Sequence, residues 1–233
     1  VDLLLAGTHP AVRRLVVEEM VAHQLGMLYK RAGQKAHEAA VLPASQRRDQ
    51  FLQALPFSLT GAQQRVIAEI DSDLTEPAPM MRLVQGDVGS GKTLVAACAA
   101  LNAVDAGYQV ALMAPTEILA EQHYRNMRQW LSPLGIEVAW LTGSLTAKVR
   151  RETGEALASG RVQVVVGTHA LFQEAVVFHR LALVMIDEQH RFGVHQRLAL
   201  REKGRQGNQV PHQLVLTATP IPRTLAMSLY GDL

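Results

Sequence analysis

The sequence contains little of what a secreted, membrane or zinc-clustered protein needs. Its single cysteine, Cys98, excludes a disulfide framework and a cysteine-based zinc cluster, and its nine histidines show no zinc-ligand spacing. No apolar run reaches the length of about 18 residues that crosses a bilayer, so the sequence predicts no membrane span. The 23 Lys and Arg residues nearly balance the 21 Asp and Glu residues, and a net charge of +2 neither requires nor excludes a polyanionic partner.

What remains is the composition of a globular protein. Apolar residues make up 48% of the 233 positions and charged residues 19%, which supports the core of one large domain or two small ones. The chain does not begin with Met and stops directly after a helical pattern. We therefore expect it to be a piece of a longer protein.

The pattern of apolar residues changes near residues 55 and 56. Residues 9–32 predict one helix with a single apolar stripe that favours docking, and Gly33 is expected to end it. A short helix is predicted over residues 46–54. Residues 1–55 therefore form a helical segment, and residues 56–233 form a separate domain.

In this second part, short apolar runs alternate with helical patterns. Strands are predicted at 81–85, 109–114, 136–141, 162–166, 181–186 and 212–217. Helices are predicted at 60–70, 92–106, 116–131, 146–159, 193–205 and 222–230. Continuous Val, Ile and Leu runs between helices indicate an α/β fold, with a parallel sheet of six or seven strands covered by helices on both faces.

A glycine-rich octet after the first strand matches the phosphate-binding pattern G-x-x-x-x-G-K-[ST] in full. Its residues are Gly86, Asp87, Val88, Gly89, Ser90, Gly91, Lys92 and Thr93. The glycines let backbone N–H groups face a phosphate, and the following helix adds its positive N-terminus. We expect Lys92 to bind the β- and γ-phosphates of ATP and Thr93 to ligate Mg²⁺. The alternative is a glycine turn with a surface lysine.

Two acids end the strand at 181–186. In a doubly wound sheet, strands end at the ligand crevice, so Asp187 is expected to face the phosphate loop and hold the Mg²⁺ water shell. Glu188 is then the general base for the attacking water. Gln189 and His190 are placed to sense the γ-phosphate. The alternative is an acidic loop after a buried strand.

The Asp-Glu-x-His box resembles that of superfamily 2 helicases. Weaker motifs elsewhere in the chain occur in the order found in that superfamily. Phe57, Thr60 and Gln63 resemble the adenine-reading Q motif. Thr116 lies in a segment like motif Ia, while Thr168 and His169 lie in one like motif Ib; these are the candidate DNA contacts. Gln189, Thr217 and Thr219 are the candidate coupling residues, the last two in a segment like motif III.

Four longer runs resemble the RecG family of bacterial ATP-dependent DNA helicases. They cover residues 83–93, 167–173, 187–197 and 217–227. The translocase module of the transcription-repair coupling factor is similar, but Ser90 and Gln189 favour RecG. A nucleotide-binding module with a regulatory, non-motor role is the other alternative.

The resemblance implies two RecA-like lobes with ATP between them, of which this chain holds the first. The second lobe with its arginine finger, and the wedge domain that residues 1–55 would join to the motor, are expected to be missing. The resemblance also implies that the longer protein acts on branched DNA, namely replication forks and Holliday junctions, in the bacterial cytoplasm at the nucleoid. The piece alone is expected to be inactive.

A basic stretch follows the acid box, with Arg191, Arg197, Arg201, Lys203 and Arg205 against Glu202. It could contact DNA or the second lobe. A run of like charges is also typical of a solvated helix face, and the sequence leaves both interpretations open.

Overall fold

The computed structural model describes residues 10–35, 37–188, 203–205 and 207–218. Its contacts divide the chain into two units, with helix α2 in one and His37–Pro220 forming the other. The helix predicted at 222–230 and all but the end of the one predicted at 193–205 lie outside the described residues. Among the described helices, none has the length and apolar character needed to cross a membrane.

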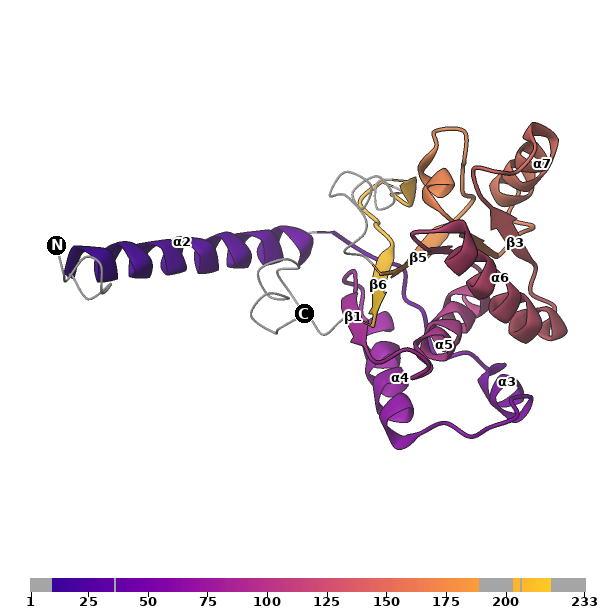
Figure 1. Ribbon diagram of the computed structural model, residues 1–233, viewed down its shortest axis with the longest axis horizontal. Helices are drawn as coiled ribbons and strands as arrows, with labels where there is room; N and C mark the ends of the chain where they lie inside the picture. The colour runs from indigo at the N-terminus through magenta and orange to yellow at the C-terminus, as the bar shows by residue number, and fades with distance from the viewer. Residues whose placement is uncertain (1–9, 36, 189–202, 206, 219–233) are drawn as a thin grey trace. The chain divides into compact units, whose positions relative to one another are not determined.

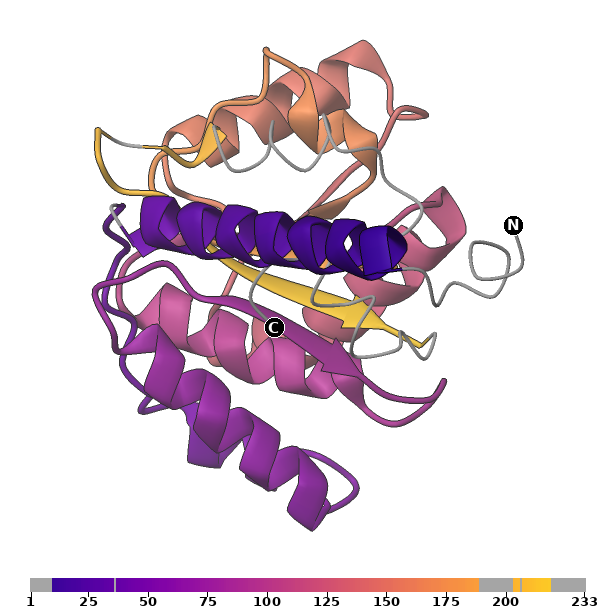
Figure 2. The ribbon, with the colours of Figure 1, turned by 90° about the vertical axis from the view of Figure 1, so that its left-hand side faces the viewer.

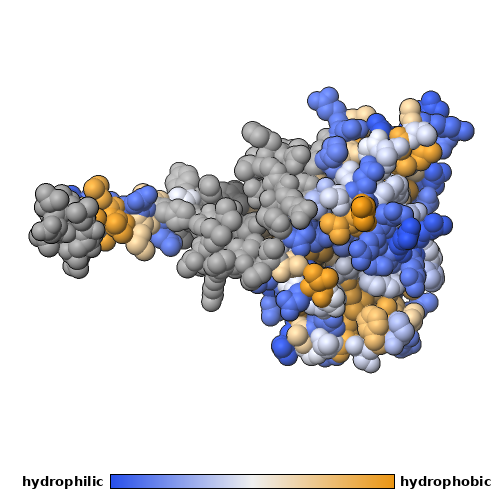
Figure 3. All heavy atoms as spheres, viewed as in Figure 1, coloured by the Kyte–Doolittle hydropathy of each residue, from blue (hydrophilic) through white to orange (hydrophobic). Residues whose placement is uncertain are grey.

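Helix α2 spans Pro10–Lys35 and runs past Gly33, so the predicted end at that glycine is wrong. A glycine inside a helix costs only about 1 kcal/mol relative to alanine, and the flanking Lys, Arg and Gln residues favour the helix. The apolar side chains of α2 are mostly exposed, and several are visible in Figure 3. The exposed large apolar side chains of α2 are Leu15, Val16, Val17, Met20, Val21 and Leu25.

The other unit is built on one six-stranded sheet in the order β1-β6-β5-β2-β4-β3, with every pair parallel. The strands are β1 (Met81–Gln85), β2 (Gln109–Met113), β3 (Val138–Leu141), β4 (Val164–Gly167), β5 (Leu181–Asp187) and β6 (His212–Thr217). The predicted α/β fold is confirmed. All six strands lie where the apolar runs place them, within two residues at each end.

Helices cover both faces of this sheet (Figures 1 and 2). The helices are α3 (Arg48–Gln53), α4 (Gly61–Leu74), α5 (Lys92–Asp105), α6 (Glu117–Leu131) and α7 (Ala147–Ala158), with short 3₁₀ turns η1 (Ser132–Leu134) and η2 (His169–Phe172). Strand β2 shows the alternation: Val110 and Leu112 face the core formed with α4, α5 and α6, whereas Ala111 and Met113 face the core formed with α7 and η2.

Helix α5 is the most buried helix of this unit. Every residue from Leu94 to Val104 is buried, because the sequence there is almost all Ala, Leu and Val. Cys98 lies among them, and burial raises the pKa of its thiol to about 11. The thiol is therefore protonated at neutral pH and behaves as a small apolar group.

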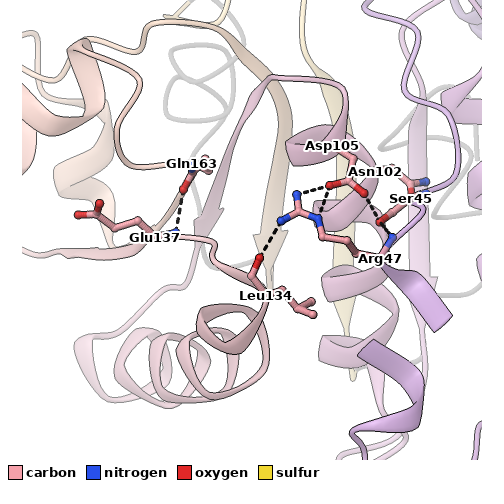
Figure 4. A network of polar contacts seen from close by, with 7 residues as sticks. All are labelled: Ser45, Arg47, Asn102, Asp105, Leu134, Glu137 and Gln163. Carbon is pink, nitrogen blue, oxygen red and sulfur yellow. Dashed lines mark hydrogen bonds and ion pairs between the residues drawn. The ribbon is translucent and has the colours of Figure 1, made fainter. Parts of the chain in front are cut away.

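Residues 37–55 pack on the sheet domain, although the sequence grouped them with the N-terminal helical segment. Glu38 pairs with Gln209 just before β6. Arg47 forms an ion pair with Asp105 of α5 and donates to the Leu134 carbonyl over 2.8 Å, as Figure 4 shows. The contacts therefore place the division between units after residue 36 and not near residue 55.

His212 joins this N-terminal segment to the sheet. Its Nδ1 accepts from the Met80 amide over 3.0 Å, and its Nε2 donates to the Ala40 carbonyl over 2.7 Å. Burial lowers the pKa of this fully buried imidazole, and protonation at Nδ1 would break the bond from Met80. The neutral ring is therefore the form that fits the fold.

We predict that the free energy of unfolding falls as the pH drops below about 6.5, the ordinary pKa of histidine. Below that pH the unfolded chain binds a proton that the folded His212 does not, so the loss reaches at most about 1.4 kcal/mol per pH unit. Urea unfolding between pH 5 and 7 measures it. The free energy of unfolding of the His212→Gln variant should fall less steeply as the pH drops. A slope equal to that of the unaltered chain would contradict the assignment of this loss to His212.

Candidate functional site

Three strand ends meet at one edge of the sheet, because β6 lies between β1 and β5. The Gly86 amide, directly after β1, donates to the Thr217 carbonyl over 3.2 Å. The Glu188 amide, directly after β5, donates to the Leu216 carbonyl over 2.9 Å. The phosphate loop, the acid pair and the segment like motif III are thereby fixed to one another through the backbone.

The phosphate loop has the backbone geometry of an anion site. Gly89 and Gly91 have φ values of 81° and 88°, which only glycine adopts without strain. A Cβ on Gly86 would lie 2.6 Å from the Ser90 hydroxyl, and one on Gly91 would collide with the Gln63 side chain. The chain thus uses glycine where the loop turns and where another group approaches it.

Donors for an anion are present in this loop. Within the described part of the chain, the N–H groups of Val88, Gly89 and Gly91 have no acceptor. Helix α5 begins at Lys92, so its positive N-terminus faces the same loop. The Lys92 ammonium donates to the carbonyls of Gly86 and Asp87 over 2.5 and 2.8 Å and so lies over the loop. Thr93, the second residue of α5, is partly exposed there. These features fit a phosphate chain with a divalent cation.

Asp187 ends β5 as a buried carboxylate and makes a contact that the sequence did not suggest. Its Oδ2 lies 2.7 Å from Nε2 of His123, a buried residue of α6. His123 shares the buried face of α6 with Ala120 and Met127. A polar residue on an apolar stripe was the one signal that could have drawn attention to it.

Glu188 adopts a φ of 50°, unusual for a residue other than glycine. Its Oε1 accepts from the Ala218 amide over 2.9 Å, and its Oε2 accepts from the Thr217 hydroxyl over 3.3 Å. The second acid is therefore held by the segment like motif III.

Of the predicted adenine-reading residues, Gln63 lies beside the phosphate loop. Thr60 caps α4 in a reciprocal capping box with Gln63. The Gln63 amide also donates to the Ser90 carbonyl over 2.8 Å, so it ties α4 to the loop. Phe57 is 52% exposed in a cavity of about 540 Å³. The cavity is lined by Asp49, Leu52, Gln53, Leu55, Pro56, Phe57, Ser58, Leu59 and Gln64.

The two candidate nucleic-acid segments follow β2 and β4 and are bonded to each other, since the Ala114 amide donates to the Gly167 carbonyl over 3.0 Å. The Thr116 hydroxyl caps α6 by accepting from the Leu119 amide. His169 is exposed, but the Thr168 hydroxyl is buried and has no partner among the described residues. Only part of this edge therefore offers donors at the surface.

The remaining predicted residues Gln189, His190 and Thr219 lie outside the described residues, as do most of the basic stretch. Of that stretch, the Lys203 ammonium donates to the carbonyls of Gln173 and Val176 over 2.5 and 2.9 Å. Burial lowers its pKa. Lys203 is thus engaged with the loop that follows η2.

Comparison with known proteins agrees with this arrangement. Residues 60–228 match the family model of the DEAD/DEAH box helicases. The chain belongs to the DEAD/DEAH box helicase family. The predicted resemblance to RecG is confirmed as a strong similarity. The ATP-dependent DNA helicase RecG of Escherichia coli (strain K12) is 64% identical over 97% of this chain and 33% of that protein.

More distant proteins of the same name are also similar. The RecG of Aquifex aeolicus (strain VF5) is 49% identical over 95% of this chain and 28% of that protein. A solved structure of RecG bound to a three-way DNA junction superposes with a TM-score of 0.81 and 42% identity, over 94% of this chain and 29% of that one. The chain thus spans about a third of the length of the curated relatives it matches.

Gly91 and Gly89 allow a matched test of the loop. Both have positive φ, but only a Cβ on Gly91 meets another group. We predict that Gly89→Ala lowers the free energy of unfolding by about 1–2 kcal/mol, the cost of the left-handed conformation. Gly91→Ala should lower the free energy of unfolding by more than Gly89→Ala does, because its Cβ also displaces Gln63. Urea unfolding measures both, and equal losses would contradict the proposed packing of Gln63 against the loop.

Proposed function

We propose that this chain is the ATP-binding motor lobe of a RecG-like ATP-dependent DNA helicase or translocase. The observation that carries the proposal is the edge where β1, β6 and β5 end, because it joins the phosphate loop, the acid pair and the segment like motif III through backbone and side-chain hydrogen bonds. The high identity to RecG over nearly the whole chain supports the same assignment.

The chain's own residues supply half of an ATP site. Free loop amides and the N-terminus of α5 bind phosphate oxygens, and Lys92 leaves the loop carbonyls to bind the β- and γ-phosphates. Thr93 and Asp187 hold Mg²⁺, Phe57 stacks on adenine, and Gln63 recognises its polar edge. When bound, Mg²⁺–ATP supplies the hydrolysable phosphate that drives the motor.

Glu188 accepts the proton of the attacking water, and its bonds to Thr217 and Ala218 transmit the state of the site to the neighbouring segment. Gln189, His190 and Thr219 are assigned to sensing and coupling. On the adjacent strand ends, Thr116 and the exposed His169 contact nucleic-acid phosphates, whereas the predicted contact of Thr168 does not fit its buried hydroxyl. The two functions thus share one edge of the sheet.

The substrate follows from the relatives. The longer protein remodels stalled replication forks and branch-migrates Holliday junctions in DNA repair and recombination. It works in the bacterial cytoplasm at the nucleoid. The second RecA-like lobe completes the ATP cleft, and the wedge domain holds the branch point.

The general-base role of Glu188 can be separated from its anchoring role. In a protein that joins this chain to its second lobe, Glu188→Gln should bind ATP normally but lower kcat about 10²-fold or more, because an amide cannot accept the proton. Thr217→Val, which removes one anchor of the carboxylate, should lower kcat less than about tenfold. Phosphate release measures both, and normal turnover by Glu188→Gln would exclude Glu188 as the base.

The isolated 233-residue chain should bind nucleotide weakly, hydrolyse it negligibly and not unwind DNA. An arginine finger typically contributes about 10³–10⁵ in rate, and the family supplies it from the second lobe. Phosphate release with and without a synthetic three-way junction tests this, with Glu188→Gln as the control for contaminating activity. Adding the second lobe should restore turnover, whereas strong DNA-stimulated hydrolysis by the chain alone would contradict the one-lobe proposal.

A further inference from the structure

We propose that His123 is a positioning residue that fixes the Asp187 carboxylate for its divalent cation. The inference rests on the proposed function and extends it to a residue on a different element. Asp187 is the last residue of β5, whereas His123 lies in the second turn of α6, and their side chains meet over 2.7 Å. With the carboxylate as acceptor, the ring donates from Nε2.

The geometry assigns the two carboxylate oxygens different tasks. Oδ2 is engaged by His123, and both side chains are only about a tenth exposed. A buried carboxylate held through one oxygen has a fixed orientation, so Oδ1 is the oxygen left to face the cation and its water. Partners that orient metal-binding carboxylates typically contribute 10–100-fold to metal affinity.

Packing alone does not explain why a histidine stands at position 123. Its neighbours on the buried face of α6 are Ala120 and Met127, and an apolar side chain would satisfy that face. The other ring nitrogen, Nδ1, is buried and has no partner among the described residues. A buried polar atom without a partner costs about 1–3 kcal/mol, so the bond to Asp187 is the contact that accounts for the ring.

Helix α6 connects this contact to the candidate nucleic-acid edge. Thr116, which lies in the segment like motif Ia, caps the start of α6. His123 follows seven residues later, about 10 Å along a rigid helix. Glu117 also accepts from the Ser144 amide over 3.2 Å, which fixes the start of the helix to the loop after β3. The position of α6 therefore sets the position of the ring against Asp187.

The test compares nucleotide affinity with and without metal. The Kd of a fluorescent ATP analogue is measured for the full chain in Mg²⁺ and in EDTA, and Mn²⁺ bound with the analogue is counted by electron paramagnetic resonance. His123→Ala should lower the metal-dependent gain in affinity about tenfold. Its Kd in EDTA should stay within about twofold of the value for the unaltered chain. His123→Gln, whose amide nitrogen can replace Nε2, should restore most of that gain.

His212→Ala is the matched control, since it removes another buried histidine, one bonded through both ring nitrogens and lying away from the loop. It should destabilise the fold and leave the metal-dependent gain unchanged. The proposal would be overturned if His123→Ala kept the full metal-dependent gain in affinity of the unaltered chain. It would also be overturned if His212→Ala lost as much of that gain as His123→Ala.

Two further outcomes are decisive. If the unaltered chain binds nucleotide without any metal-dependent gain, or if Lys92→Ala binds as the unaltered chain does, the proposed function fails together with this inference. If these two controls behave as expected and only His123→Ala shows no effect, the inference alone fails.

A second measurement keeps the proposal testable should His123→Ala not fold. Nuclear magnetic resonance of the histidine rings in the metal-free chain should show that Asp187→Asn shifts the His123 signals and leaves those of His212 in place. Unchanged His123 signals would overturn the proposal.

Discussion

The position of β6 between β1 and β5 is the constraint on which the candidate site depends. Parallel pairing brings the carboxyl ends of these strands to one edge. Two backbone bonds then fix the segments that follow: Gly86 to Thr217, and Glu188 to Leu216. Because these bonds join main-chain atoms, the relative position of the phosphate loop and the acid pair is a property of the sheet itself. Side chains at this edge refine an arrangement that strand order has already set.

The same edge continues across β5 to β2 and β4, whose ends carry the candidate nucleic-acid segments. The candidate nucleotide segments and the candidate nucleic-acid segments are thus neighbours along one row of strand ends. The side chains of the acid pair bond to elements on both sides of β5. Glu188 bonds back to the segment after β6, and Asp187 bonds forward to His123 on the helix after β2. The acid pair therefore faces both halves of the edge, one residue toward each.

The sequence predicted the elements well because each has a local cause. Apolar runs define the strands, and the octet at 86–93 defines the loop and the start of α5. Contacts between distant residues were not predictable in this way. His123 and Asp187 are 64 positions apart, and no local pattern shows that they meet. The same holds for residues 37–55, which the sequence grouped with residues 1–36 in one helical segment, because their partners, such as Asp71, Asp105 and His212, lie far along the chain. Gln63 was assigned to adenine from its motif, and its capping box and its bond to Ser90 emerge only when α4 is placed beside the loop.

Side-chain contacts with α4 and α5 connect residues 37–55 to the candidate nucleotide site. Asn102 of α5 is fully buried; its Oδ1 accepts from the Ser45 amide and from Arg48, and its Nδ2 donates to Asp71 of α4. Separating the segment from α5 would leave Oδ1 of Asn102 without its partners, at about 1–3 kcal/mol for a buried polar group. The segment, α4 and α5 therefore favour moving together. Since α5 begins at Lys92 and α4 is tied to Ser90 through Gln63, residues 45–48 are linked to the phosphate loop through both of these helices.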